Sequence, residues 1–509
     1  MKRVHLFTLL LLLLPTIANS KEDQKKKKRP YDDVVFNWTH TFGEVLQLAK
    51  EKHYRIDDPE QAMIQSINGF LTKLDPHSSF FDPKTYRMII ETTSGEFFGI
   101  GVVIDATRKP KDRFLMILDV IPDGPSEKAG IEPYDKVIEI EGKTLEGMTT
   151  EEATAKLRGE KGTKVHIKVL REDKPEPIPF DITRGVVKEQ TSLAFYLKDY
   201  ETYYLSLSSF TSNAVQQIEH LLEKSTREKY RGLILDLRNN SGGLLRSAID
   251  IAGLFLPKNS LVVTTRDKTN QETERFATKR EPVANNGLPI FILTNNFTAS
   301  AAEILAGCLK IHSDNMAKKA GNKKQKQLMV FLVGSTTFGK GSVQEIIPVS
   351  NNCAAKITTS LYHLPDGSTI QGSGIETDFN IEKLFSAPEQ VEWFKKFYGR
   401  EKALTDYILP YGQEKKDPNP STGSRLQGST ADAAGQAKKE KKKAKNWAER
   451  ARESLAKDNQ FLGAITLLNS FDFAAKNMPE KVRNRTQAVS YLKTTFATHG
   501  KLNMDEIKA

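Results

Sequence analysis

The 509-residue chain is too long for one hydrophobic core, so its length predicts two to four domains. Its hydrophobic fraction of 38% and charged fraction of 27% are typical of a soluble globular protein with polar linkers. The net charge of +11 is concentrated in basic runs without interleaved aromatic residues, which argues against nucleic-acid binding and leaves contact with anionic membrane surfaces open. These runs are Lys25–Arg29, Lys318–Lys326 and Lys438–Lys445.

The N-terminus has the pattern of a cleaved export signal. Lys2 and Arg3 precede the apolar run Leu6–Ile17, and Ala18-Asn-Ser20 offers the small residues that a signal peptidase reads. We therefore expect an exported protein, periplasmic or otherwise extracytoplasmic. Two cysteines, Cys308 and Cys353, are too few for a disulfide framework, and one bridge or two separate thiols both remain open.

Apolar residues recur at helical spacing from Val34 to Leu74, which predicts two helices separated near Arg55–Pro59. The turn that follows contains Asp75 and His77. We interpret these two as satisfied polar groups of a structural turn, because no partner ligands stand at a metal-like spacing.

A β-rich block occupies about residues 93–173, with helical spacing only around Glu151–Leu157. Its order of elements resembles a PDZ domain. Successive N–H groups of such a domain's binding loop hold a peptide's C-terminal carboxylate. The resemblance places Phe98, Gly99, Ile100 and Gly101 in that loop and implies protein or peptide partners with free, apolar C-termini. The alternative is a hairpin whose glycines serve only its turn.

Strands then alternate with helices, which predicts an α/β domain. Thr202–Phe210 reads as a half-buried strand, Ala214–Leu222 as a helix and Arg231–Leu237 as a buried strand. The second strand ends in Arg238-Asn-Asn-Ser-Gly-Gly243, and glycines directly after a strand let the backbone approach a ligand closely. We expect Asp236 to anchor this turn rather than act as a catalytic acid.

The segment Pro289–Gln344 carries the candidate chemistry. Pro289–Asn296 reads as a buried strand, and a helical pattern starts at Ser300. The serine would lie at a helix N-terminus, where unpaired N–H groups and the helix dipole favour a developing oxyanion. Ser300-Ala-Ala-Glu303 also fits a capping box, so Ser300 is either a nucleophile or a helix cap.

A lysine follows the next strand. Leu328–Val333 reads as buried, and Lys340 stands between two glycines beyond it. No histidine lies in a motif that supplies a base, whereas burial can lower a lysine pKa far enough for that task. Gln344, four residues on, offers an amide oxygen that orients the amine without adding a charge.

Three ordered motifs closely resemble those of the carboxy-terminal processing peptidases, also called tail-specific proteases. They are Asp236-Leu-Arg-Asn-Asn-Ser-Gly-Gly243, Thr298-Ala-Ser-Ala-Ala-Glu303 and Thr337-Phe-Gly-Lys-Gly-Ser-Val-Gln344. The resemblance implies a cofactor-free and metal-free serine endopeptidase with Ser300 as nucleophile, Lys340 as general base and Gln344 as its orienting residue. It also implies an oxyanion hole formed by Ala301 and by Gly242 or Gly243.

The predicted fold class is therefore α/β and multidomain, with an α/β serine-peptidase core, an inserted PDZ-like β-rich domain and flanking helices. The predicted segments are a signal peptide (1–20), a basic linker (21–33), an N-terminal helical region (34–92), the PDZ-like domain (93–173), the peptidase core (174–385), a linker (386–446) and a C-terminal helical region (447–509).

Two other functions compete with this one. Gly334–Lys340 fits most of a Walker A loop, but Gly341 lacks the hydroxyl that binds Mg²⁺ and the residues beyond it read as a strand where a helix is needed. The second alternative is a catalytically inert PDZ-type peptide-binding scaffold, which the presence of nucleophile, base, orienting residue and glycine pair argues against.

Overall fold

The structure is a computed structural model that describes residues 30–55, 58–105, 111–121, 123–284, 287–320, 328–383, 401, 408–412 and 447–499. The predicted signal peptide, residues 21–29 of the basic linker, most of the linker 386–446 and residues 321–327 of the Lys-rich insertion lie outside the described residues. By its internal contacts the chain divides into two units, 1–65 and 66–509.

The first unit contains α1 (Pro30–Lys52) and the start of α2 (Pro59–Leu71). The two helices and the break between them agree with the spacing of the apolar residues. Several of those apolar residues are nevertheless exposed, including Trp38 at 69% and Val45 at 55%. The helical spacing of the apolar residues therefore predicts the helices of this segment correctly, but it does not indicate that these residues are buried.

The PDZ-like domain is an antiparallel sheet in the order β3-β4-β5-β7-β8, with β6 beside β5. Its strands are β3 (Val102–Ile104), β4 (Leu115–Val120), β5 (Lys136–Ile140), β6 (Lys143–Thr144), β7 (Lys164–Leu170) and β8 (Ile178–Thr183), and its helices are α4 (Pro125–Ala129) and α5 (Thr150–Leu157). Because β8 pairs with β7 along six residues, this sheet extends to Thr183, past the predicted limit at 173.

A short ribbon leads into and out of this domain. It pairs β2 (Glu96–Gly99) with β9 (Gly185–Lys188), and α3 (Pro83–Ser94) precedes it. The side chain of Asn213 donates to the carbonyl of Gly95 at 3.0 Å, which links the ribbon to the following domain.

The α/β core predicted at residues 174–385 is built on a six-stranded sheet in the order β10-β11-β12-β15-β16-β19. All neighbouring pairs are parallel except β10 with β11. The strands are β10 (Ser192–Leu197), β11 (Thr202–Leu207), β12 (Gly232–Asp236), β15 (Pro289–Thr294), β16 (Met329–Gly334) and β19 (Phe379–Asn380), with the 3₁₀ turn η1 (Lys198–Tyr200) between the first two. β12, β15 and β16 are buried at every residue, as expected of parallel strands covered on both faces.

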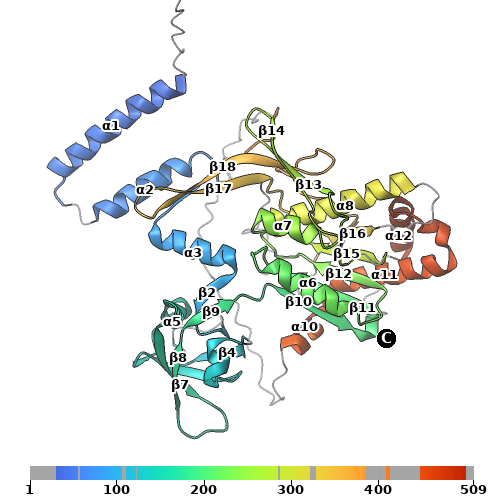
Figure 1. Cartoon of the computed structure of the whole chain (residues 1–509), viewed down its shortest axis with the longest axis horizontal. Coiled ribbons are helices and arrows are strands. Elements are labelled where there is room, and N and C mark those ends of the chain that lie inside the picture. The colour runs from blue at the N-terminus through green and yellow to red at the C-terminus, as the bar shows by residue number, and fades with distance from the viewer. Residues whose placement is uncertain are drawn as a thin grey trace, which may run out of the picture. The chain divides into compact units, whose positions relative to one another are not determined.

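Helices cover both faces of this sheet (Figure 1). Alternate strand residues such as Leu235 and Ile292 pack against α6 (Ala214–Ser225), α7 (Leu245–Ala252) and α8 (Ala301–Ala320). Their neighbours Ile234 and Phe291 pack on the other side. The helices of that second face are α10 (Trp447–Leu455), α11 (Asn459–Asn477) and α12 (Arg485–His499), with the 3₁₀ turn η3 (Pro479–Lys481). The C-terminal helices thus complete the hydrophobic core of this α/β domain.

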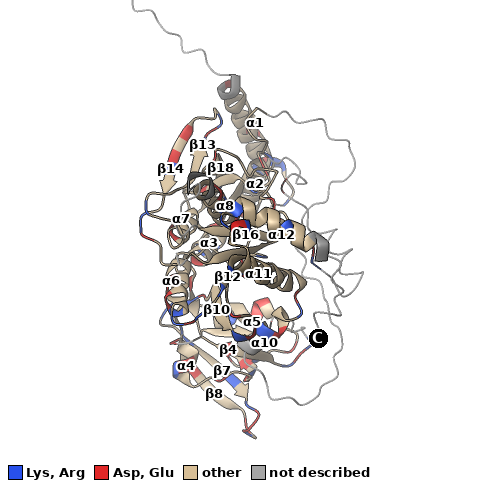
Figure 2. Cartoon of the chain, turned by 90° about the vertical axis from the view of Figure 1, so that its right-hand side faces the viewer, with Lys and Arg blue, Asp and Glu red and all other residues tan. Residues whose placement is uncertain are grey.

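A second sheet stands beside the core helices, in the order β1-β18-β13-β14, with β17 also paired to β18. Its strands are β1 (Ser79–Phe81), β13 (Leu261–Arg266), β14 (Glu272–Ala277), β17 (Ser342–Pro348) and β18 (Ala354–His363). The edge strand β14 carries Glu272, Glu274 and Arg275. Figure 2 shows charged positions along β14, and charges on an edge strand discourage its pairing with another chain.

The predicted fold class is confirmed: an α/β core, an inserted β-rich domain and flanking helices. Cys308 and Cys353 are both buried and form no disulfide, so the bridge left open by the sequence is not formed. Across the described ranges, no helix is both long and apolar enough to cross a membrane.

Candidate active site

Ser300 lies between the end of β15 and the first residue of α8. The Thr298 hydroxyl of this turn donates to the carbonyl of Leu237 at 2.8 Å, which ties the turn to the end of β12. Ser300 has a φ of 54° and is 7% exposed. This left-handed conformation costs a residue with a side chain about 1–2 kcal/mol, so the surrounding contacts must hold it. Strain of this kind clusters at functional sites.

The backbone of Ser300 is not that of a helix cap. A capping residue usually has an extended backbone, and its side chain accepts a hydrogen bond from the first turn. Ser300 has a positive φ, and within the described ranges its hydroxyl forms no hydrogen bond to the first turn of α8. Only the other half of the capping box is present, because the Ser300 N–H donates to Glu303 Oε2 at 2.8 Å. The Ser300 hydroxyl is thus not used to cap α8.

The glycine pair after β12 packs against this serine. A Cβ atom added at Gly242 would lie 2.9 Å from the Cβ of Ser300 and 3.0 Å from the amide nitrogen of Ala301. The Gly242 N–H donates to Asn240 Oδ1 at 2.8 Å, whereas the Gly243 N–H bonds to none of the residues that the structure describes. Of the two glycines expected at the oxyanion hole, Gly243 therefore has the available donor.

Lys340 lies in the loop between β16 and β17, and its Nζ donates to Gln344 Oε1 at 2.5 Å. Burial, and after it the positive charge of Lys356, lower the pKa of Lys340 to about 8. The carboxylates of Glu401, Glu303 and Asp75 act in the opposite direction and do not outweigh these effects. An amine with this pKa is partly neutral near physiological pH and can accept a proton.

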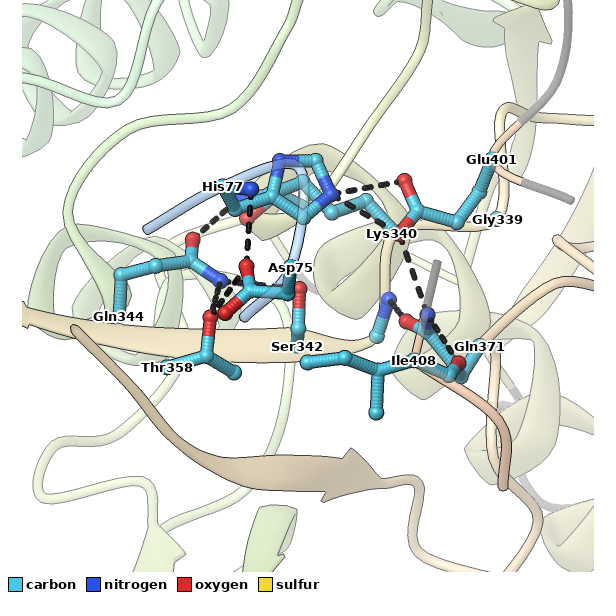
Figure 3. A network of polar contacts seen from close by, with 12 residues as sticks. Asp75, His77, Gly339, Lys340, Ser342, Gln344, Thr358, Gln371, Glu401 and Ile408 are labelled. Carbon is cyan, nitrogen blue, oxygen red and sulfur yellow. Dashed lines mark hydrogen bonds and ion pairs between the residues drawn. The ribbon is translucent and has the colours of Figure 1, made fainter. Parts of the chain in front are cut away.

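Gln344 is itself held by a chain of hydrogen bonds that leads to the turn at Asp75 (Figure 3). Its Nε2 donates to Ser342 Oγ at 2.9 Å and to Thr358 Oγ1 at 3.3 Å, and the Thr358 hydroxyl donates to Asp75 Oδ1 at 3.0 Å. Because its nitrogen is engaged in this way, Gln344 must present its oxygen to Lys340.

Asp75 accepts further bonds from the His77 and Ser78 backbones at 2.8 and 2.9 Å, so it does anchor a turn as interpreted from the sequence. Although burial acts in the opposite direction, the hydrogen bonds from Ser78, His77 and Thr358 hold the pKa of Asp75 below its usual range. Its link to Lys340 through Gln344 was not predicted, since Asp75 and Lys340 lie far apart in the sequence.

A second branch of polar contacts supports the same loop from the other side (Figure 3). The Gly341 N–H donates to Gln371 Oε1 at 2.7 Å, and Gln371 Nε2 donates to Glu401 Oε1 at 3.1 Å. Glu401 is fully buried and contacts His77 Nε2 at 2.8 Å. Sequence reasoning missed Gln371 and Glu401, because neither belongs to a recognisable pattern.

Asp236 is an anchor, as expected. It accepts from the Tyr204 hydroxyl at 2.8 Å and from Arg238 Nη2 at 2.6 Å, and Arg238 Nη1 donates at 2.6 Å to Asp458, the N-cap of α11. This buried cluster ties the turn before the glycine pair to the C-terminal helices.

No hydrogen bond joins Ser300 to Lys340, or Ser300 to any histidine, among the residues that the structure describes. In the same ranges no group of three His, Cys, Asp or Glu side chains gathers as a metal site. Catalytic hydrogen bonds are often long before substrate binds and tighten in the complex.

Of the four residues expected in the carboxylate-binding loop, Phe98 and Gly99 end β2, and Ile100 and Gly101 follow it. Ile100 is 2% exposed in the core of that domain, and Gly101 has a φ of 76°. The carbonyl of Ile100 accepts from Ser126 N at 2.8 Å, so the loop is fixed by internal bonds. The guanidinium of Arg158, directly after α5, lies 4.7 Å from the ring of Phe97 and adds a positive charge near the loop.

Comparisons with known proteins agree with this architecture. The model of peptidase family S41 matches residues 201–381, and that of the PDZ domain matches residues 87–170. A carboxy-terminal-processing protease of Bartonella bacilliformis is 33% identical over 346 residues, which cover 67% of this chain and 74% of that protein. A carboxyl-terminal-processing protease of Synechocystis sp. is also 33% identical, over 62% of this chain and 70% of that protein.

A third relative, the carboxy-terminal processing protease CtpA of Bacillus subtilis, is 31% identical over 65% of this chain and 66% of that protein. The chain belongs to peptidase family S41, as a carboxy-terminal processing protease with a PDZ domain. It is thus a serine-type hydrolase, and the inert-scaffold alternative is not favoured.

Proposed function

We propose that this protein is an exported endopeptidase that cleaves protein tails by Ser-Lys catalysis, with Ser300 as nucleophile and Lys340 as general base. The observation that carries the proposal is the bond from Lys340 Nζ to Gln344 Oε1 at 2.5 Å in a buried setting that lowers the lysine pKa. Gln344 orients the amine and adds no negative charge that would raise this pKa.

The reaction has two halves. The neutral Lys340 amine takes the proton of Ser300 Oγ as that oxygen attacks the scissile carbonyl. The resulting oxyanion accepts hydrogen bonds from the backbone N–H groups of Ala301, at the start of α8, and Gly243. Protonated Lys340 then gives its proton to the leaving amine, and water hydrolyses the acyl-enzyme by the same steps in reverse.

Substrate binding is expected to complete the pair. Lys340 Nζ has three hydrogens when charged and a lone pair when neutral, so it can keep Gln344 as a partner while it accepts from Ser300. A peptide lying across Ser300 excludes water from the site and favours the neutral amine. We therefore expect the Ser300–Lys340 hydrogen bond to form in the substrate complex.

The PDZ domain is proposed to recognise the substrate's free, apolar C-terminus through Phe98, Gly99, Ile100 and Gly101. Loop N–H groups suit a carboxylate, and the adjoining strand edge can add the peptide as a further strand. The positive charge of Arg158 near this loop supports the assignment. Export to the periplasm or another extracytoplasmic space, with contact to the membrane surface, is proposed from the sequence alone, because residues 1–20 lie outside the described ranges.

The test is mass spectrometry of unstructured peptides that differ at their C-termini, incubated with the wild-type protein and with Ser300→Ala. We expect internal cleavage of peptides with apolar ends by the wild type and none by the variant. Cleavage by Ser300→Ala at the wild-type rate would remove Ser300 from the nucleophile role. Binding without cleavage by the wild type would favour the scaffold instead.

A further inference from the structure

Glu303 is a buried carboxylate that the proposed mechanism does not use. It lies in the first turn of α8, three residues after Ser300, and is 0% exposed. Carboxylates are almost never fully buried unless they are paired or fully hydrogen-bonded. Among the described residues no cation forms an ion pair with Glu303. Its hydrogen bonds must therefore stabilise the buried carboxylate.

Four donors converge on this one carboxylate. Oε2 accepts from the Ser300 N–H at 2.8 Å and from the Lys340 N–H at 2.9 Å. Oε1 accepts from the Gly339 N–H at 2.7 Å and from the Thr337 hydroxyl at 2.5 Å. A single oxygen atom therefore contacts the backbones of both proposed catalytic residues.

All four partners donate, so the site is matched to an ionised carboxylate, which only accepts. Burial nevertheless raises the pKa of Glu303 to about 7, and the bonds from Thr337, Ser300, Gly339 and Lys340 oppose that rise. Burial of the charged Glu303 carboxylate thus reduces the free energy of unfolding of the protein. A cost of this kind is typical of functional sites.

Capping α8 does not explain this arrangement. A capping box requires only the bond from the Ser300 N–H. The other three donors come from the loop at 337–340, which is far from α8 in sequence. Thr337 is itself fixed, because its Oγ1 accepts from the Ile375 N–H at 2.7 Å. Glu303 therefore joins two separate loops.

We infer that Glu303 is a positioning residue that sets the separation between the backbones of Ser300 and Lys340, and through them the distance between nucleophile and base. The inference rests on the proposed Ser-Lys function. Misplacement of a catalytic group by 1 Å costs about 100-fold in rate. Loss of the shared oxygen frees the two loops to separate by such a distance.

Glu303→Gln tests this inference, since glutamine keeps the size and replaces one acceptor oxygen by an NH₂ that faces donors. We expect kcat to fall about 100-fold while KM stays within about threefold, because the substrate-binding groups are not altered. Reaction of Ser300 with a fluorophosphonate probe should slow in parallel. An unchanged kcat in folded Glu303→Gln would overturn the inference.

Asp378→Asn is the matched control for stability. Asp378 is a carboxylate whose side chain is 8% exposed, and its Oδ2 accepts from the Leu332 N–H of β16 at 2.9 Å and from Arg485 Nη2 of α12 at 2.5 Å, both outside the catalytic loops. Its loss should lower the melting temperature and leave kcat per folded molecule unchanged. An equal fall of kcat in both variants would mean that Glu303 acts only on stability and would overturn the inference.

Thr337 provides a second pair of variants if Glu303→Gln does not fold. Thr337→Val removes one donor to Glu303 and should lower kcat roughly tenfold, whereas Thr337→Ser keeps the hydroxyl and should restore it. Equal activity of the two would overturn the inference. Ser300→Ala is assayed alongside to separate the two hypotheses. If Ser300→Ala remains active, the Ser-Lys proposal fails. If Ser300→Ala is inactive and Glu303→Gln has normal activity, only the positioning role of Glu303 fails.

Discussion

Gly242 and Ser300 are packed so closely that a Cβ atom on Gly242 would lie 2.9 Å from the Cβ of Ser300. The two residues come from different turns, one after β12 and one after β15, which are adjacent parallel strands. Because the carboxyl ends of parallel strands meet at one edge of the sheet, the topology brings these turns together.

Gly242→Ala should therefore lower activity by about 100-fold. The new methyl group meets backbone atoms of Ala299 and Ala301 and the φ of 105° is strained for alanine. The measurement is kcat/KM together with the melting temperature. Gly367→Ala is the matched control, since Gly367 has a φ of 82° but nothing within 4 Å of an added Cβ. It should lose some stability and no activity; an equal activity loss would show that strain alone matters.

Ser300→Ala and Lys340→Ala should each abolish peptide hydrolysis, and the double variant should be no worse than either one. A nucleophile and its base act as one unit, so their losses do not add. The residual hydrolysis rates of the three variants, measured with one peptide, show whether the two losses of activity add. Additive losses would mean that the two residues act in separate steps.

The rate should climb with pH through a value near 8, because only neutral Lys340 can accept the Ser300 proton and its pKa is lowered to about 8. Lys356→Met removes the positive charge that helps to lower this pKa and should move the profile to higher pH. Lys164→Met, at an exposed position of β7, is the control and should leave the pH profile unchanged.

Lys340→Arg should be inactive, since the guanidinium group keeps its proton. Turnover by this variant would contradict the assignment of Lys340 as the base.

Lys340→Met should be more stable than the wild type at pH 7. The folded pKa of Lys340, about 8, lies below the unfolded value of 10.5, so the folded state binds its proton less tightly than the unfolded state does. Charged Lys340 therefore destabilises the fold at pH 7, by on the order of 1–3 kcal/mol. The penalty fades as pH rises from 8 to 10.5. Denaturant unfolding at pH 8 and at pH 10.5 measures the free energy of unfolding of both proteins. The difference between Lys340→Met and the wild type should become smaller as the pH rises.

Amidation of a substrate's C-terminus should slow its cleavage at subsaturating concentration by roughly tenfold to a hundredfold, the cost of one set of charge-assisted hydrogen bonds. The reason is the proposed carboxylate site at Phe98–Gly101. Acetylation of the same peptide's N-terminus is the matched control, because it removes a charge from the other end. Equal rates for the free and amidated peptides would assign the PDZ domain another role.

The local patterns were sufficient for much of the fold and for the catalytic candidates. Buried runs of apolar residues identified β12, β15 and β16, and helical spacing identified α1, α2 and the C-terminal helices. The hydrogen bond between Lys340 and Gln344 joins residues only four positions apart, across a loop and the start of a strand, so the sequence could suggest this contact.

The sequence alone determined which groups are available for chemistry: a serine at a helix start, a lysine between glycines and a glycine pair after a strand. Only the tertiary structure decided that Ser300 has a left-handed backbone conformation rather than the extended one of a helix cap, and that the Gly242 N–H donates to Asn240 Oδ1. It also brought Asp75, Thr358 and Glu303 to the catalytic loops. These contacts join residues tens to hundreds of positions apart. Local periodicity carries no information about such pairings, because they depend on which strand edges and turns the packed sheets place side by side.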